Sequence, residues 1–366
     1  MSPKRYPVLD HLVAMTDDTG MIQHARLDIP NRSTGYCTDD IARGLIVAVE
    51  AAGRHATETI ASRLVTIYLA YLHDAQMTDG WFHNFMGYDR VWQDQRGTPD
   101  SFGRALWGLG HCMRFAPQDS WSRVAADIFA RALPHVEQLE HRRSHAYAAL
   151  GCIHAFESRY GDADALRPAI ADSISSIARD FDRHSGPDWG WYEELMTYDN
   201  ARLPEALIRG GAVLGSDRFI QIGLTMLDFY ASVVIEDGLF VPVGNNGWYR
   251  RGGTKARYGQ QPLEAAAMID ASLAALERTG DDRYRRYADI AYDWFFGRNT
   301  AQALLVTGGG CRDGIDVQGV NANMGAESTL AYLLGAISAS SVPGKRLHVA
   351  ASAAGAEPAG GKPSRR

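Results

Sequence analysis

Acidic residues just ahead of alanine-rich apolar segments are the feature of this sequence best suited to chemistry. Asp39 and Asp40 are adjacent in GYCTDDIARGLI, and Arg43 follows within one helical turn. The arrangement returns in PDSFGRALWGL, where Asp100 is followed by Arg104. Two carboxyl groups in different protonation states can protonate a leaving oxygen and activate a water molecule, which is general acid–base catalysis. The alternative interpretation is that each acid only caps a helix or pairs with the nearby arginine.

The same kind of polar head begins further small-residue segments along the chain. A looser copy is YDNARLPEALI, which contains Asp199 and Arg202. Three more segments are RRSHAYAALGCIHAF, QQPLEAAAMIDASLAAL and NANMGAESTLAYLLGAI. The heads lie 45 to 65 residues apart, and they are Asp39, Asp100, His145, Asp199, Glu264 and Glu327. An interval of this size predicts a repeat of helical hairpins with loop insertions.

Longer amphipathic segments alternate with these small-residue segments. Examples are TETIASRLVTIYLAYLHDAQ and SDRFIQIGLTMLDFYASVVI, and YPVLDHLVAM can serve as the sixth. Small side chains suit helices packed inside a ring, and a one-sided apolar stripe suits helices on its outside. We therefore expect an all-α closed ring of six inner and six outer helices, with an open solenoid as the alternative. The ring is expected to occupy residues 1–340 as one domain, followed by a disordered tail over 341–366.

Aromatic loops are expected at one end of this ring. The segments TDGWFHNFMGYD, PDWGWYEELMTYD and EDGLFVPVGNNGWYRRGG place Asp and Gly around aromatic residues, which indicates turns and short β-hairpins. If all inner helices point the same way, their amino termini meet at one end of the ring, which we call the funnel. The acidic heads and the aromatic loops would then surround the same space.

Five motifs carry a resemblance to a known family: HLVAMTDDTGMIQHA, GYCTDDIARGL, YDNARLPEAL, QQPLEAAAMIDA and NANMGAESTLAYLL. With the alternating helices, they resemble the six-hairpin glycosidase superfamily, in a bacterial glycosidase-like branch often associated with glycosyltransferases. The resemblance covers roughly residues 6–340. It implies an (α/α)6 barrel and a carbohydrate-active enzyme. The superfamily contains inverting glycoside hydrolases, sugar phosphorylases, sugar 2-epimerases and lyases, so the fold alone does not select the reaction.

The expected activity is an inverting glycoside hydrolase that acts on a short oligosaccharide. We expect Glu194 to be the proton donor, because the aromatic rings of WGWYEE would disfavour its charge, and Asp40 to be the base. The other catalytic candidates are Asp39, Asp100, Asp199 and Glu264. The substrate-binding candidates are Arg43, Arg104, Trp81, His83, Trp189, Trp191, His145, Arg202, Trp248, Gln261, Asp313 and Glu327.

Three other functions stay open. A glycoside phosphorylase would use the basic, glycine-containing loop NNGWYRRGGTKARYGQQ to bind phosphate. A sugar 2-epimerase would need histidines facing the funnel, and only His145 stands at the head of an inner helix. A non-catalytic glycan-binding module would need the aromatic residues but no pair of acids.

Composition excludes other classes. The net charge of −6 supplies no basic excess for nucleic acid or an anionic membrane. The four cysteines are far apart and form no CxxC, and no metal-binding or nucleotide-binding motif is present, so we expect no metal and no cofactor. The amino terminus has no apolar signal segment and no run is long enough to cross a membrane, so we expect a cytoplasmic protein.

Overall fold

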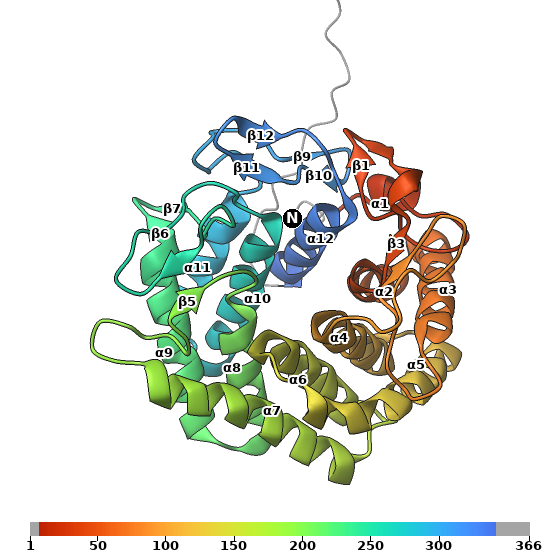
Figure 1. Ribbon diagram of the computed structural model, residues 1–366, viewed down its shortest axis with the longest axis horizontal. Helices are drawn as coiled ribbons and strands as arrows, with labels where there is room; N and C mark the ends of the chain where they lie inside the picture. The colour runs from red at the N-terminus through yellow and green to blue at the C-terminus, as the bar shows by residue number, and fades with distance from the viewer. Residues whose placement is uncertain (1–6, 342–366) are drawn as a thin grey trace, which may run out of the picture.

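The closed ring of helices is present. The structure is a computed structural model and describes residues 7–341, so the predicted tail lies outside the described residues except for Ser341. Each inner helix packs against the next, and the last packs against the first, which confirms a closed barrel rather than an open solenoid (Figure 1). The inner helices are α2 (Thr38–Ala52), α4 (Pro99–Phe115), α6 (Arg142–Phe156), α8 (Arg202–Leu214), α10 (Pro262–Thr279) and α12 (Ala326–Ser341).

An outer helix accompanies each inner helix. The outer helices are α1 (Asp10–Ala14), α3 (Glu58–Ala75), α5 (Asp119–Ala132), α7 (Ala163–His184), α9 (Asp217–Val234) and α11 (Asp282–Asp293). Two short 3-10 helices, η1 (Arg32–Thr34) and η2 (Leu133–Gln138), lie in the connections. The sixth outer helix, α1, has only five residues, so YPVLDHLVAM forms a much shorter helix than its counterparts.

Small residues allow the inner helices to approach closely. A Cβ atom added at Gly110 of α4 would lie 2.1 Å from the backbone oxygen of Gly151 in α6. A Cβ atom at Gly108 would lie 2.4 Å from the oxygen of Ala42 in α2. Because real side chains do not come so close, glycine is required where these three backbones meet. The alanine- and glycine-rich character of the inner segments is thus explained by backbone contact.

Short antiparallel strands lie in the long connections that lead from outer to inner helices. Four are local hairpins and two join separate connections. The hairpins are β1 (Ala25–Arg26) with β2 (Ile29–Pro30), β6 (Ile235–Glu236) with β7 (Leu239–Phe240), β9 (Val306–Thr307) with β10 (Gly310–Cys311), and β11 (Gly314–Asp316) with β12 (Gly319–Asn321). The other pairs are β3 (Tyr36–Cys37) with β4 (Phe85–Met86), and β5 (Leu195–Met196) with β8 (Tyr249–Arg250). These strands hold the loops around the amino-terminal ends of the inner helices (Figure 1).

Among residues 7–341, none of the helices combines the length and the apolar character that a membrane-spanning segment requires.

Candidate active site

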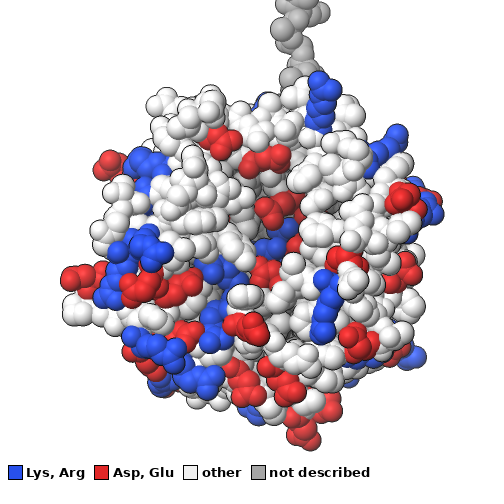
Figure 2. Space-filling model, viewed as in Figure 1, with Lys and Arg blue, Asp and Glu red and all other residues white. Residues whose placement is uncertain are grey.

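The amino-terminal ends of the inner helices surround a hollow in the middle of the loop-bearing face. Acidic and basic side chains lie together inside this hollow, which is the funnel (Figure 2). The first turns of four inner helices contribute the acids, namely Asp39 and Asp40 on α2, Asp100 on α4, Glu264 on α10 and Glu327 on α12. Asp199 stands just before α8. The structure therefore brings these acids together at one end of the ring, as the repeat predicted.

Arg104 joins two of the acids across the barrel. Its Nη1 donates to Asp39 Oδ1 at 3.2 Å, and its Nη2 lies 3.6 Å from Asp199 Oδ2. Tyr147 on α6 donates its hydroxyl hydrogen to the same Asp199 oxygen at 2.6 Å and accepts from Arg104 at 2.9 Å. Asp39 keeps 17% of its side-chain surface exposed, whereas Asp199 is buried. Asp39 is thus the member of this network that solvent or a ligand can reach.

Asp199 is held in an unusual backbone conformation. Its φ angle is +48°, in the left-handed region that side-chain-bearing residues rarely adopt. Conformations of this kind cost of order 1–3 kcal/mol and persist only where the surroundings enforce them. The second side-chain oxygen, Oδ1, is buried and accepts no hydrogen bond within the described residues, and the nearest cation is Arg202 Nε at 3.6 Å. The fold therefore maintains a strained, incompletely bonded carboxylate beneath the funnel.

Asp40 has a different environment from its neighbour Asp39. It is 3% exposed and pairs with Arg43 Nη2 at 2.8 Å. Burial raises the pKa of Asp40 to about 7, although Arg43 opposes the change. Arg43 also donates through both Nη atoms to Glu327 Oε2, at 3.2 Å each. Asp40 is therefore the acid of α2 that can hold a proton near neutral pH.

Glu264 also has a raised pKa, but its surroundings indicate a structural role. It is 1% exposed, and burial raises its pKa to about 7. Its carboxyl group accepts from the backbone nitrogens of Asp199 and Asn200, from the Asn200 side chain, and from the Tyr230 hydroxyl at 2.6 Å. These bonds fix the loop that carries Asp199.

Asp100 lies beside the aromatic rim. It accepts from the Ser144 hydroxyl and from the Tyr198 hydroxyl, both at 2.5 Å. The ring of Trp248 lies 6.3 Å from the ring of Tyr198, is half-buried, and stands on a residue with φ of +59°. Trp248 is thus the predicted tryptophan that remains available to a ligand at the funnel.

A small polar pocket of about 260 Å³ opens next to Glu327. Gln261 and Asp313 line it, together with His24. Asp313 accepts from the backbone nitrogen of Gly325 and from the Ser328 hydroxyl, both at 2.8 Å. Glu327 has 40% of its side-chain surface exposed. The substrate-binding candidates Gln261, Asp313 and Glu327 are therefore brought together.

Glu194 lies apart from this group. Its side chain is 49% exposed and pairs with Arg251 at 3.2 Å on the outer part of the loop. The dry aromatic surroundings that the sequence predicted for it are absent, because Trp189 and Trp191 point into the core instead. The raised pKa expected of a proton donor is found at Asp40.

Three of the tryptophans predicted to bind substrate are core residues. Trp81 stacks on Phe102 with ring centroids 4.1 Å apart, Trp189 packs against Phe229, and Trp191 against Tyr230. All three tryptophans are at most 5% exposed. His83 is half-buried and stacks on Trp92 at 4.9 Å.

His145 and Arg202 point away from the funnel. His145 bonds to the Leu139 oxygen at 2.7 Å and faces Ser173 of α7, so it lies between the inner and outer layers. Arg202 extends down the barrel, where its Nη1 donates to Glu205 and Asp270 at 2.7 Å each. Neither position matches the sugar contact that the sequence predicted.

Residues that the sequence analysis did not select complete the site. The hydroxyl groups of Tyr147 and Tyr198 orient Asp199 and Asp100 respectively. Arg143 donates to the backbone oxygen of Tyr198 and to the hydroxyl of Tyr192. Tyr147 follows Arg143 by one helical turn in RRSHAYAAL, so the head of that helix carried a usable signal.

Comparisons with known proteins agree with this architecture. No protein-family model matches the sequence, and no curated protein matches it. Several solved structures are similar to this chain. The cellobiose 2-epimerase from Bacillus thermoamylovorans has 12% identity and a TM-score of 0.70, covering 90% of this chain and 96% of that one. The cellobiose 2-epimerase from Spirochaeta thermophila has 11% identity and a TM-score of 0.71, covering 92% and 94%.

A third solved structure is an inactive variant of an α-1,6-mannanase from Salegentibacter, in complex with α-1,6-mannotetrose. It has 9% identity and a TM-score of 0.60, covering 90% of this chain and 95% of that one. In that variant two consecutive aspartates are replaced by alanine. The chain described here has the same (α/α)6 barrel fold as these structures, which confirms the fold that the motifs predicted. At these identities the likeness shows the fold alone.

Proposed function

We propose that this protein is a carbohydrate-active enzyme, and that its funnel hydrolyses a glycosidic bond of a short oligosaccharide with inversion. One observation carries the proposal: two adjacent acids of α2 have different surroundings. Asp39 is paired with Arg104 and is partly exposed, whereas burial raises the pKa of Asp40 to about 7. Glycoside hydrolysis requires two carboxyl groups with different roles, one that donates a proton and one that activates water.

In this proposal Asp40 supplies the proton to the leaving oxygen and Asp39 activates water. Both oxygens of Asp39 are already engaged, because Oδ1 accepts from Arg104 and Oδ2 lies 3.6 Å from the Cys37 sulfur that donates to it. A carboxylate held in this way is better suited to orienting a water molecule than to attacking carbon itself. The mannanase variant, inactive after replacement of two consecutive aspartates, supports the importance of such a pair in this fold.

The small pocket beside Glu327 supports a short substrate. Its volume of about 260 Å³ and its amide and carboxylate lining suit the hydroxyl groups of a single terminal sugar. Trp248, in the loop that also contributes Asn245 to this pocket, offers a flat face for an adjoining ring.

A sugar 2-epimerase is the second candidate, because two cellobiose 2-epimerases are among the similar structures. Proton transfer at a sugar carbon suits imidazole bases. Within residues 7–341, His24 lines the small pocket, whereas His145 points outward. A phosphorylase is less well supported, since Arg251, Lys255 and Arg257 of the basic loop are already paired with carboxylates.

The test is incubation of the protein with reduced and unreduced oligosaccharides of glucose and mannose, with and without phosphate. Hydrolysis is expected, with a first product of inverted anomeric configuration by NMR. Formation of a sugar phosphate would instead indicate a phosphorylase, and formation of a C2 epimer would indicate a 2-epimerase. Binding without turnover would indicate a glycan-binding module. The double variant Asp39→Ala/Asp40→Ala controls for contaminating enzymes.

Replacement of Trp248 by alanine is expected to raise KM up to about tenfold and to leave kcat within about twofold, because stacking on an aromatic ring contributes roughly 0.5–1.5 kcal/mol to ground-state and transition-state binding alike. Steady-state kinetics check this, with Trp248→Phe expected to retain most of the affinity. A large fall in kcat at unchanged KM would contradict a binding role.

A further inference from the structure

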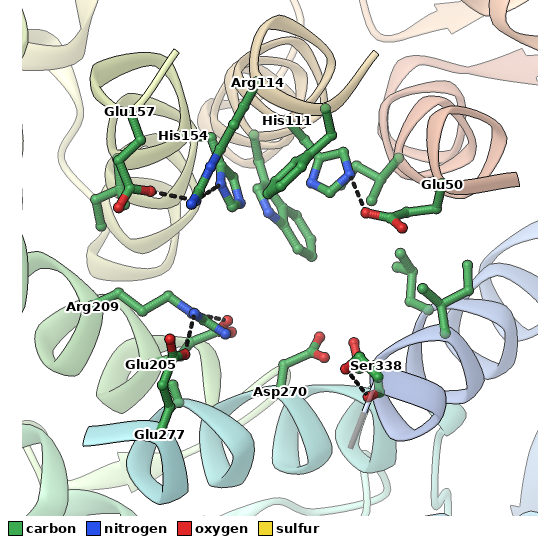
Figure 3. A pocket seen from close by; sticks show the side chains of 18 of the residues that line it. Glu50, His111, Arg114, His154, Glu157, Glu205, Arg209, Asp270, Glu277 and Ser338 are labelled. Carbon is green, nitrogen blue, oxygen red and sulfur yellow. Dashed lines mark hydrogen bonds and ion pairs between the residues drawn. The ribbon is translucent and has the colours of Figure 1, made fainter. Parts of the chain in front are cut away.

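A second cavity lies at the opposite mouth of the barrel, where the inner helices end. Its volume is about 690 Å³, and all six inner helices contribute to its lining (Figure 3). The small pocket beside Glu327 shares none of its residues. A volume of this size is in the range of small-molecule sites. The cavity is therefore large enough for a ligand, and the reaction proposed for the funnel does not involve it.

Four acids near this cavity each lie beside a basic side chain. Their carboxylates are therefore already engaged and are not free to recruit a cation. The pairs are Glu50 with His111, Glu157 with Arg114, Glu205 with Arg209, and Asp270 with Arg202 (Figure 3). Such pairs instead present donors and acceptors side by side, as the hydroxyl groups of an uncharged molecule require.

His111 adds a buried polar group with spare hydrogen-bonding capacity. It is 7% exposed, and its Nε2 lies 3.1 Å from Glu50 Oε1, but the alignment does not meet hydrogen-bond geometry. A buried nitrogen without a well-formed hydrogen bond is unfavourable, and a ligand hydroxyl can supply the missing partner.

Part of the lining is apolar and includes the indole of Trp107 with Ile208 and Leu334. A sugar has hydroxyl edges and C–H faces, so it can meet paired charges and an apolar wall at once. We propose that the cavity at the ends of the inner helices is a second binding site, and that it takes an uncharged mono- or disaccharide.

Arg202 links this second site to the funnel. Its Nη1 binds Glu205 and Asp270, which line the cavity, and its Nε lies 3.6 Å from Asp199 Oδ1. Its guanidinium also lies 4.6 Å from the centre of the Trp107 ring. A sugar that hydrogen-bonds to Glu205 or Asp270 therefore acts on the same guanidinium that faces the strained carboxylate above.

Blocking the cavity mouth tests the proposal without relying on turnover. Ala212 is exposed and lines the cavity, so Ala212→Trp should fill its entrance, and Ala212→Ser is the matched control. Calorimetric titrations with glucose, mannose and cellobiose are compared for the native protein and both variants. A sugar is expected to bind the native protein and Ala212→Ser alike, and at least tenfold more weakly, or with one site fewer, to Ala212→Trp.

Identical titrations of Ala212→Trp and Ala212→Ser would overturn the proposal, as would tighter binding of glucosamine or glucuronate than of glucose. Ser341→Trp, at the exposed end of α12 on the same rim, provides a second blocking variant if Ala212→Trp does not fold. A protein that binds sugar at this mouth but cleaves none would contradict the proposed hydrolysis only. Hydrolysis without any effect of the blocking variants on binding would contradict only the second site.

Discussion

Replacement of Asp39 by asparagine is expected to lower turnover of the oligosaccharide substrate by about 10²–10⁴-fold, the range that one general base supplies. The change removes the charge that activates water and keeps the size of the side chain. Because the leaving group does not take its proton from Asp39, an activated aryl glycoside should lose activity to the same extent. The measurement is kcat for both substrates, with circular dichroism and thermal unfolding as checks on the fold.

A matched control is available near the rim. Asp18 is exposed and pairs with Arg90, so Asp18→Asn removes an acid of the same type outside the funnel. It is expected to change unfolding free energy by less than about 1 kcal/mol, as exposed ion pairs do, and to leave turnover unchanged. Near-normal turnover of Asp39→Asn would remove Asp39 from the mechanism.

The ring of helices was predictable from the sequence because its signal repeats. Each inner segment needs small residues where neighbouring backbones touch, as at Gly108 and Gly110, and each needs a polar head. The positions of the acids follow from the same repeat, since a residue in the first turn of an inner helix must lie near the funnel. Asp39, Asp100 and Glu327 were located in this way.

The direction of single side chains was not predictable to the same degree. One helical position turns a side chain by about 100°, so His145 lies at the correct height but faces the outer layer. The partners in the ion pairs also differ from those that the spacing favoured. The spacing favoured Asp39 with Arg43 and Asp100 with Arg104, whereas Arg43 binds Asp40, and Arg104 of α4 binds Asp39 on the neighbouring helix α2.

Loop residues were the least predictable. The motif WGWYEE places aromatic and acidic residues together along the chain, but the strand pairing of β5 with β8 turns Trp189 inward and leaves Glu194 beside Arg251. The proton donor expected there is replaced in our proposal by Asp40, whose burial depends on the closure of the ring between α2 and α12 and is not visible in local sequence.

Replacement of Asp40 by asparagine is expected to have an effect that depends on the leaving group. Turnover of the natural oligosaccharide should fall by about 10²–10⁴-fold, because its leaving oxygen needs the proton. A nitrophenyl glycoside, which departs without protonation, should lose less than about tenfold. Loss of equal size with both substrates would contradict the assignment of Asp40 as the proton donor.

The pH dependence gives an independent test of the same residue. Activity of the native enzyme should fall as pH rises through about 7, because Asp40 then loses its proton. As pH rises, the free energy of unfolding should fall at lower pH values, before the fall in activity, and should level off above about pH 7. The folded pKa lies above the ordinary value of about 3.9, so the folded state binds more protons between roughly pH 4 and 7 and loses stability as pH rises through this window, at a slope of up to about 1.4 kcal/mol per pH unit.

Asp40→Asn should flatten this decline in stability, measured by denaturant unfolding at pH 5, 6, 7 and 8, leaving the smaller decline that Glu264 contributes through its own raised pKa. Retention of the full native slope in Asp40→Asn would show that Asp40 is ionised throughout the folded state. A carboxyl group ionised at pH 5 has no proton to give to a leaving oxygen at pH 7, so that single result would remove Asp40 as the proton donor on which the proposed hydrolysis depends.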